Sequence, residues 1–432
     1  MGIQGRNAAE IFASIRQGVQ SGEWLPGQVL PPVRELAEAL AVNRNTVAAV
    51  YKRLVSAGIA ATQGRLGTVI CAATRQGELE GAAIESGLLD LASGNPAAAW
   101  LPNPWLALQT VAPKPRLYGE PEVNPRLEGL ARRWFADAGM SDYALNLGHG
   151  AVDGIERLLM AYLMPGDRVA LEDPCFLGSL HTLRALNMKP VAVAVDAEGM
   201  VPDALLRALE QGVQALVYTP RAHNPTGCSL SVSRAEQLRA ILADYPHVLL
   251  IEDDHFALLA AQAYVSMIPP TSLHWARLRS VSKGLGPDWR VAVLASDAQT
   301  SQRLRMRMTS GASWVSHLLQ DAVSGLLESA TVQAQLDMAR DDYAHKRHTL
   351  VRELAAQGLP LALAGDGLNV WIPLAVDANE MAHRLARRGW LVRSSAAFTL
   401  QSVQQAIRVT ISTLDDAQSK RFVADFKAVL SD

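Results

Sequence analysis

The sequence has little cysteine, almost no net charge and no long apolar run. Its three cysteines among 432 residues, Cys71, Cys175 and Cys228, are widely spaced and match neither a metal-binding nor a redox motif. This usage is typical of a reducing compartment, so we expect structural cysteines and no bound metal. The formal net charge of −2 excludes a chain that is basic throughout, so any contact with nucleic acid must come from a local patch.

A membrane segment is also missing from the sequence. No apolar run is long enough to span a bilayer, and the N-terminus does not resemble a signal peptide. We therefore expect a cytoplasmic protein with no membrane partner. The length exceeds one ordinary domain and shows no internal repeat, which favours a small head followed by a large body.

Lys283 is the most informative residue of the body. A lysine that holds pyridoxal 5'-phosphate (PLP) as an aldimine needs a lowered pKa, and the phosphate of PLP needs hydroxyl donors and a fixed cation. Ser280, Ser282 and Arg290 lie close to Lys283 in the chain and can supply these groups. A lysine at a strand end is by itself more often a solvated surface residue, so the prediction depends on further motifs.

Two of these motifs follow apparent strands. Asn224, in the stretch 219–227, can donate to the phenolic oxygen of the pyridine ring. The apolar run 248–251 leads into Asp253 and Asp254, either of which can pair with the pyridinium nitrogen and keep the ring an electron sink. Ligands beyond the carboxyl ends of parallel strands are the expected geometry of an α/β sheet.

A third motif predicts a phosphate loop. Gly150, Ala151 and Val152 open an apolar-periodic helical segment that runs from Ile155 to Leu163. Backbone amides at the N-terminus of such a helix bind anions. Four motifs in this order therefore predict bound PLP.

With these motifs, residues from about 90 to 430 resemble a fold-type I aminotransferase of the aspartate aminotransferase superfamily. The resemblance implies a large mixed-sheet α/β domain with a smaller α+β C-terminal part. It implies Lys283 as the catalytic, aldimine-forming lysine, Asp253 in preference to Asp254 as the ring-nitrogen partner, Asn224 as the ring-hydroxyl donor and Arg290 as the phosphate arginine. Since fold-type I sites are usually built at a subunit boundary, it also implies a homodimer.

The same resemblance assigns two further roles and shows two departures. Phe176 lies where the family stacks an aromatic ring on PLP, although core packing is an alternative, and Arg408 lies where the family binds a substrate or effector carboxylate, although a structural salt bridge is an alternative. His255 replaces the usual tyrosine near the ring, as a cofactor contact or as a core histidine. Ala151 and Val152 replace hydroxyl or amide side chains, so only their backbone groups remain.

The first 70 residues predict a winged helix-turn-helix. Helices are expected over 9–19, 32–40 and 44–54, with Asn43 as the N-cap of the third. A buried stripe along the third helix leaves its N-terminal end exposed, as in a recognition helix that meets base edges in the major groove. The stripe consists of Val47, Val50, Tyr51 and Leu54, and the exposed residues are Arg44, Asn45, Thr46 and Ala48.

The stretch 63–69 predicts the wing, in which Gly67 allows close approach to the DNA backbone and Arg65 can reach the minor groove. This head resembles the GntR family of bacterial repressors in the stretches 30–37, 43–47 and 64–68. The resemblance implies Arg34 and Arg44 as DNA-contacting arginines, with Thr46 and Arg65 in support. The head carries a local excess of about three positive charges, which matches a DNA-binding role.

A GntR-like head fused to an aminotransferase-like body is the plan of the MocR regulators. We expect a DNA-binding domain over 1–70, a linker over 71–89 and a PLP-binding, dimerisation and effector domain over 90–432. The form of the asparagine motif, Thr219–Gly227, is similar to that of MocR members associated with vitamin B6 salvage.

The expected function is a transcriptional regulator that binds operator DNA and senses PLP itself, or an amine or amino acid, through the aldimine at Lys283. The alternative is a working aminotransferase with an appended head. The fused DNA-binding head favours the regulator, while the retained lysine, aspartate and carboxylate-binding arginine leave half-transamination chemically possible.

Overall fold

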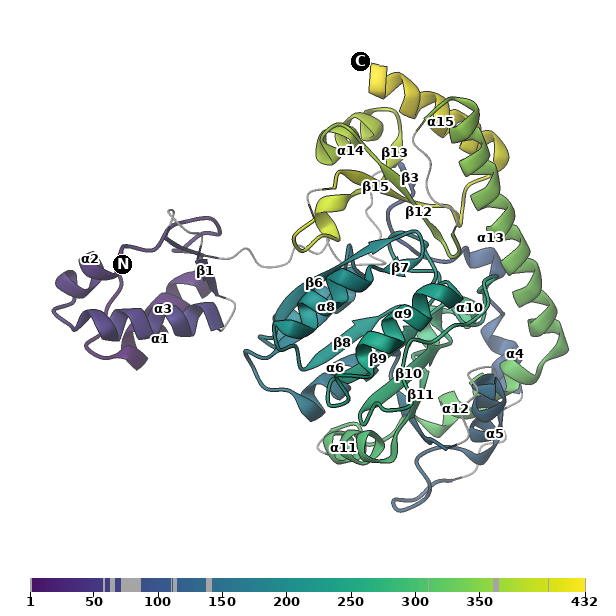
Figure 1. Cartoon of the computed structure of the whole chain (residues 1–432), viewed down its shortest axis with the longest axis horizontal. Coiled ribbons are helices and arrows are strands. Elements are labelled where there is room, and N and C mark those ends of the chain that lie inside the picture. The colour runs from purple at the N-terminus through teal and green to yellow at the C-terminus, as the bar shows by residue number, and fades with distance from the viewer. Residues whose placement is uncertain are drawn as a thin grey trace. The chain divides into compact units, whose positions relative to one another are not determined.

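The computed structural model describes residues 2–56, 59–62, 67–70, 87–109, 111, 115–136, 142–309, 311–359, 365–402 and 404–431. They form two compact units, an N-terminal head and a body, each described by itself below (Figure 1). Within these ranges no helix is both long and apolar enough to cross a membrane.

The head is a three-helix unit with a short hairpin. Its elements, in chain order, are α1 (Ala8–Gln20), α2 (Val33–Ala39), α3 (Arg44–Ser56), β1 (Ala60–Thr62) and the antiparallel β2 (Thr68–Ile70). The three predicted helices are confirmed, and α3 begins where expected because the Asn43 side chain accepts a hydrogen bond from the Asn45 amide at 2.8 Å. The turn of the predicted wing, with Arg65, lies outside the described residues.

The predicted stripe of α3 is buried in the core of the head, together with Ile11 and Ile15 of α1. Tyr51, at the edge of this core, donates its hydroxyl to the Pro31 carbonyl at 2.6 Å and so ties α3 to the start of α2. A third extended segment, which the sequence pattern did not predict, pairs with this hairpin. The Leu30 amide donates to the Thr68 carbonyl and the Ile70 amide donates to the Gln28 carbonyl, which extends the hairpin by one short edge.

The body is built on an eight-stranded mixed sheet. Its strand order is β4-β11-β10-β9-β8-β5-β6-β7, with β11 antiparallel to both of its neighbours and β10, β9, β8 and β5 mutually parallel. In that order the strands are Ala144–Gly148, Ala292–Ser296, Trp275–Ser280, Leu249–Asp254, Ala215–Tyr218, Arg168–Asp173, Lys189–Asp196 and Gly199–Met200.

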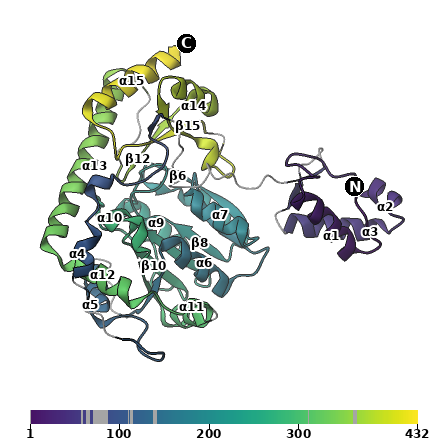
Figure 2. The same cartoon turned by 180° about the vertical axis from the view of Figure 1, so that it is seen from behind.

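Helices cover both faces of this sheet (Figures 1 and 2). Helix α6 (Ala151–Tyr162) packs so closely that a Cβ on Gly154 would meet Leu278 and Leu294. Helices α8 (Pro202–Glu210) and α9 (Val232–Leu242) pack instead on the face that carries Leu216 and Leu250. Since side chains alternate along a strand, Asp253 points to the α6 face, and its neighbours in the chain point to the other.

Further helices of the body, up to α13, connect and flank these layers. They are α4 (Pro104–Gln109), α5 (Pro125–Trp134), α7 (Leu177–Ala185), α10 (Ser282–Leu285), α11 (Ala298–Thr309), α12 (His317–Glu328) and α13 (Ala330–Ala356). Short 3-10 turns occur at Ala98–Trp100, Pro287–Trp289 and Ser395–Ala397.

After the long helix α13 the chain forms the smaller α+β part. A three-stranded sheet of order β12-β15-β14 (Asn369–Pro373, Ala406–Thr410, Arg393–Ser394) packs with α14 (Ala378–Arg387) and α15 (Asp416–Ser431). The body's first strand, β3 (Leu89–Asp90), pairs in parallel with β13 (Trp390–Leu391), so β3 begins at the last residue of the predicted linker. The predicted α/β class, with a large mixed sheet and a smaller C-terminal part, is confirmed.

Candidate functional site

The predicted cofactor residues follow strands that end at the same edge of the sheet. Strands β5, β8, β9 and β10 are parallel, and β4 runs the same way because β11 is antiparallel to both β10 and β4. The register places Ser280 and Gly148 on either side of Ala292. The segments that follow these strands therefore meet beyond one edge of the sheet, as expected for a ligand site of an α/β fold.

Arg290 lies against the loop before α6, and we call this arrangement the cradle. Arg290 has left-handed backbone angles (φ 45°), and its Nη2 donates to the His149 carbonyl at 2.7 Å. Its guanidinium lies against Gly150, where a Cβ would come within 2.7 Å of Nη2. With φ at +97°, Gly150 is also in a conformation that side chains rarely adopt, so both geometry and space require glycine here.

The N-terminus of α6 completes this cradle. Gly150 is its N-cap and provides no side-chain hydrogen bond, so the first amides, from Ala151 onward, face the loop without a capping group. The Asp153 carboxylate accepts the His149 amide at 2.9 Å. Nearby, the Ser280 hydroxyl donates to the Ser282 hydroxyl at 3.1 Å, which places two hydroxyls beside Lys283. The first amides of α6 and the two serine hydroxyls are donors of the kind that binds a phosphate.

Asp253 and Asp254 lie in different surroundings, which separates the two candidates for the ring partner. Asp254 accepts both Arg221, through Nε and Nη2 at 2.9 Å each, and Arg279 Nε, also at 2.9 Å. Asp253 is buried on the opposite face, and its Oδ1 has no hydrogen-bond partner among the described residues. Of the two carboxylates, Asp253 is therefore the one open to a further donor, and its role as the ring-nitrogen partner stays a prediction.

The pKa of Asp253 also favours a cationic partner for this carboxylate. Burial, together with the nearby Asp254 and Glu172 carboxylates, raises the pKa of Asp253 to about 7. A buried carboxylate of this kind is stabilised in its charged form by a cationic donor such as a protonated pyridine nitrogen.

His223 is a second buried charge that the sequence did not single out. Its Nε2 lies 3.3 Å from Glu172 Oε2, and its Nδ1 lies 2.7 Å from the Thr226 hydroxyl. Burial lowers the pKa of His223, but the Glu172 carboxylate and Cys228 outweigh it and raise the pKa to about 10. A protonated His223 thus sits directly beside Asn224 in the chain.

Arg408 joins the smaller part of the body to the predicted cofactor residues. It is fully buried on β15, and its Nη1 donates to Asn224 Oδ1 at 2.9 Å, although the two residues are 184 apart in the chain. Its Nη2 donates to the Ala92 carbonyl, and its guanidinium lies 4.7 Å from the centroid of the Phe398 ring. The hydrogen bond to Asn224 joins Arg408 to a second predicted site residue, and its role in binding a carboxylate stays a prediction.

His255 directly follows β9 and Phe176 comes shortly after β5, so both follow strands that end at this edge of the sheet. Burial, and next the charge of Lys283, lowers the pKa of His255 to about 4, so the imidazole is neutral at pH 7 and lies within electrostatic reach of the lysine. Phe176 follows the end of β5 and precedes α7, and its ring packs on Gly178 so closely that a Cβ there would clash with it.

The sequence did not reveal the charge network beneath these residues. Glu252 accepts the hydroxyls of Tyr218 and Tyr264, and lies 3.7 Å from Arg277. The signal was present: Glu252 and Asp254 alternate on β9, and Arg277 and Arg279 occupy the register positions opposite them on β10. The network holds the strand ends that present Asp253.

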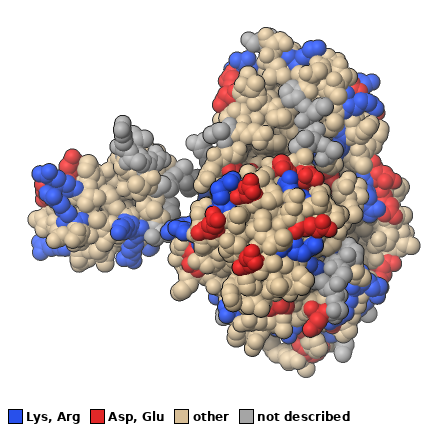
Figure 3. Space-filling view, viewed as in Figure 1, with Lys and Arg blue, Asp and Glu red and all other residues tan. Residues whose placement is uncertain are grey.

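The head presents its predicted DNA-contacting residues at the surface. Arg34 and Arg44 are 73% and 62% exposed, and Glu38 lies between them, 3.2 Å from Arg34 and 3.9 Å from Arg44. Asn45 and Gly67 are exposed and Thr46 is half-buried. Figure 3 shows that Lys and Arg side chains outnumber acidic ones on the face of the head it draws. Exposed ion pairs such as those of Glu38 with Arg34 and Arg44 contribute little to stability, so both arginines remain available to an anionic partner.

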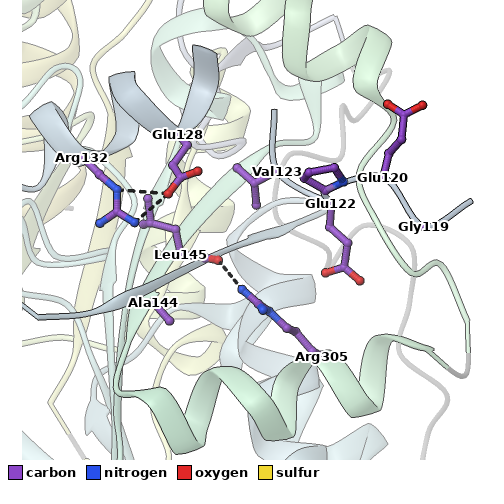
Figure 4. A pocket seen from close by; sticks show the side chains of 10 residues that line it. Gly119, Glu120, Glu122, Val123, Glu128, Arg132, Ala144, Leu145 and Arg305 are labelled. Atoms are coloured by element: carbon purple, nitrogen blue, oxygen red, sulfur yellow. Dashed lines mark hydrogen bonds and ion pairs between the residues drawn. The ribbon is translucent and has the colours of Figure 1, made fainter. Parts of the chain in front are cut away.

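A separate hollow in the body contains none of the predicted residues (Figure 4). The pocket is lined by Gly119, Glu120, Pro121, Glu122, Val123, Glu128, Arg132, Ala144, Leu145 and Arg305. Two of its charged side chains are hydrogen-bonded, since Arg132 donates to Glu128 at 2.7 Å and Arg305 donates to the Asn146 side-chain carbonyl at 2.9 Å. Within the described ranges, no group of three or more His, Cys, Asp or Glu side chains is arranged to hold a metal ion.

Comparison with known families agrees with this geometry. Residues 86–426 match the model of aminotransferase class I and II, and residues 7–70 match the model of bacterial regulatory proteins of the gntR family. The fold and site thus define a DNA-binding domain fused to an aminotransferase-type domain. The chain belongs to the aminotransferase class I and II family, whose members use PLP, and it carries a GntR-type helix-turn-helix at its N-terminus.

Full-length relatives share the same plan. The chain is 47% identical to the vitamin B6 salvage pathway transcriptional repressor PtsJ of Salmonella typhimurium, over 99% of this chain and all of that protein. It is 27% identical to the HTH-type transcriptional regulator TauR of Rhodobacter capsulatus, over 92% of this chain and 90% of that protein. The resemblance inferred from the motifs is therefore confirmed.

Solved structures show the fold of the body. The kynurenine aminotransferase of Pyrococcus horikoshii matches with a TM-score of 0.70 and 18% identity, covering 80% of this chain and 91% of that one. The multiple substrate aminotransferase of Thermococcus profundus matches with a TM-score of 0.71 and 20% identity, covering 80% of this chain and 93% of that one.

Proposed function

We propose that this protein is a transcriptional regulator of vitamin B6 salvage, whose head binds operator DNA and whose body binds PLP at Lys283. PLP itself, or an amine or amino acid that reacts with bound PLP, is the effector. The domains are a head over 1–70, a linker over 71–89 and an effector body over 90–432. The protein acts in the cytoplasm, on the nucleoid when bound to DNA.

The full-length identity to a vitamin B6 repressor carries the regulatory part of the proposal. The PLP part is supported by how well the body's residues suit the cofactor. Lys283 supplies the amine, Asp253 a buried acceptor for the ring nitrogen, and Arg290 with the first amides of α6 the phosphate cradle. Arg408 and Asn224 are hydrogen-bonded to each other, so they can orient a carboxylate and the ring hydroxyl together.

When bound, PLP supplies an electrophilic aldehyde and an electron-withdrawing ring. The protein holds its phosphate and ring nitrogen, and His255, neutral at pH 7, adds no charge beside Lys283. A ligand can change DNA binding only if it has different affinities for two arrangements of the protein. The body must therefore bind PLP differently in the DNA-bound and free forms.

The test is a titration of the apo-protein with PLP, in which absorbance of the lysine-bound cofactor and binding to the DNA upstream of its own gene are followed in the same samples. A change in DNA affinity that follows PLP binding supports the proposal. If PLP binds with no change in DNA affinity, with or without added amino acids, the protein is not a PLP-responsive regulator.

Replacing Arg44 by Ala is expected to weaken binding to that DNA by about 5- to 150-fold and to leave PLP binding unchanged. Arg44 is exposed at the N-terminus of α3, where a recognition helix meets base edges, and a bidentate arginine contact is worth about 1–3 kcal/mol. Electrophoretic mobility shifts and the PLP titration measure the two effects. Arg16→Ala, on α1, is the matched control and should bind DNA nearly as tightly as the parent.

We also propose that the protein is a homodimer. Several large apolar side chains are exposed around the start of α12: α4 packs against α12, and the Tyr118 ring lies 5.6 Å from that of Trp314. The exposed residues are Trp105, Leu106, Leu108, Leu117, Tyr118 and Leu318. An apolar patch of this kind is a usual mark of a protein interface.

Replacing Trp105 by Glu is therefore expected to convert the dimer to a monomer, because Trp105 is 68% exposed in the single chain and a charge would be buried in the interface. Sedimentation velocity measures the change. Leu206→Glu, on α8 and outside the patch, is the control and should remain dimeric. An unchanged sedimentation coefficient for Trp105→Glu would place the interface elsewhere.

The second candidate is an aminotransferase, because Lys283, Asp253 and Arg408 are all retained. It predicts stoichiometric conversion of bound PLP by an amino acid followed by repeated turnover with a keto acid. Steady turnover at a rate typical of enzymes would favour it, and a single half-reaction would not.

A further inference from the structure

One short segment of the body accepts hydrogen bonds from the residues proposed to bind the effector. Lys283 Nζ donates to the Gly94 carbonyl at 2.6 Å. Arg408 Nη2 donates to the Ala92 carbonyl, and Arg393 Nε donates to the same oxygen at 3.0 Å. We call residues 91–95 the acceptor segment.

The acceptor segment is held by other groups as well. The Gly94 amide donates to the Thr410 hydroxyl at 3.1 Å, and the Ser412 hydroxyl donates to the Asn95 carbonyl at 2.7 Å. The Leu91 amide donates to the Leu391 carbonyl at 2.8 Å. These contacts fix the backbone of the segment in register with the smaller part of the body, so the carbonyls of Ala92 and Gly94 are presented at a defined place.

The acceptor segment is also where the chain enters the body from the head. It follows directly on β3 (Leu89–Asp90), and the sequence that precedes β3 leads to the helix-turn-helix. The acceptor segment is therefore close, along the chain, to the point at which the body continues toward the head.

We infer that the acceptor segment reports the ligand state of the body to the head, with the carbonyls of Gly94 and Ala92 competing with PLP and with the effector carboxylate for Lys283 and Arg408. This inference rests on the proposed function and specifies how the same site regulates DNA binding. Arg393 is a positioning residue that keeps Ala92 in place.

The competition between the Gly94 carbonyl and PLP follows from the number of hydrogens that the Lys283 amine can donate. A lysine ammonium has three hydrogens. Once Nζ is bonded to the aldehyde carbon of PLP, with the aldehyde oxygen lost as water, it keeps at most one hydrogen, and the new bond fixes its position. The Gly94 carbonyl then loses its donor. A carboxylate bound in the bidentate manner on Arg408 withdraws Nη2 from Ala92 in the same way.

Two substitutions of Lys283 distinguish the loss of its hydrogen bond to Gly94 from the mere presence or absence of bound PLP. Neither Lys283→Ala nor Lys283→Arg can hold PLP covalently, but Arg keeps a charged donor for the Gly94 carbonyl and Ala does not. Without PLP, Lys283→Ala is expected to bind the upstream DNA with the affinity of the PLP-loaded parent, and Lys283→Arg with that of the apo-parent, each within about twofold. If both variants match the apo-parent, the inference is wrong.

Hydrogen exchange provides a second measurement that does not depend on these variants. In the parent, PLP is expected to speed exchange of the Gly94 amide and of the Ala97 amide, which donates to the Tyr343 hydroxyl, while it slows exchange around Asp253. Unchanged or slower exchange at both amides would overturn the inference.

Ser412→Ala tests the segment without touching the proposed ligand residues. It removes the donor to Asn95 and is expected to bind PLP as the parent does, but to shift DNA affinity in the apo-form toward the loaded value. Ser324→Ala removes an equally buried hydroxyl that donates within α12, and it should behave like the parent. A Ser412→Ala variant identical to the parent in both assays contradicts the inference. If instead the parent itself shows no PLP response, the proposed function has failed.

Discussion

Replacing Asp253 by Asn is expected to raise the dissociation constant of PLP by about 100-fold. The substitution keeps the shape of the side chain but removes the buried charge that suits a protonated ring nitrogen. Losing one partner of a buried, hydrogen-bonded charge pair costs about 3 kcal/mol, which corresponds to this factor. Absorbance titration of the apo-protein measures it. A dissociation constant within about threefold of the parent would remove Asp253 from the site.

The same variant is expected to stabilise the apo-protein, and more so as the pH rises. In the folded state the pKa of Asp253 is raised to about 7, above its ordinary value of 3.8. The folded state thus binds the proton more tightly than the unfolded chain, so its stability falls as the pH rises from about 4 to about 7. The Asn side chain does not ionise, so the stability of the variant does not fall with pH in this way. Thermal unfolding of the apo-forms at pH 5 and pH 8 should show a larger gain for Asp253→Asn at pH 8.

Replacing the adjacent Asp254 by Asn is expected to act in the opposite direction, lowering the stability of the body by about 3–5 kcal/mol, because it leaves the buried guanidiniums of Arg221 and Arg279 without their shared carboxylate. Urea unfolding of the two neighbouring variants measures the contrast directly. Equal stability of parent and Asp254→Asn would mean that the two arginines find other acceptors.

This contrast also shows what the sequence could predict. Lys283, Asn224, Asp253 and the loop at Gly150 each follow a strand in a short motif, so their chemistry can be recognised locally. The family resemblance favoured Asp253 over Asp254, but the two adjacent aspartates do not by themselves show a physical difference. The difference arises from the alternation of β9 and from Arg221 and Arg279, which approach only one face of the strand.

Other features could not be predicted because no local pattern carries them. Lys283 meets the Gly94 carbonyl across 189 residues of chain, and any residue at position 94 would offer the same carbonyl. The short edge at Leu30 in the head similarly depends on backbone hydrogen bonds to β2. A contact made by the backbone places little restriction on which residue type occupies the position. Functional side chains at strand ends, by contrast, can be recognised in the sequence.

The pairing of β3 with β13 sets a practical limit on how the body can be separated from its head. The Leu89 amide donates to the Gly389 carbonyl, and the Leu91 amide to Leu391, so these few residues complete the edge of the smaller part. A head-free protein that started after Asn95 would lack the carbonyls that meet Lys283 and Arg408, and its PLP affinity would not represent that of the intact chain. Proteolytic or genetic removal of the head should therefore cut upstream of Leu89.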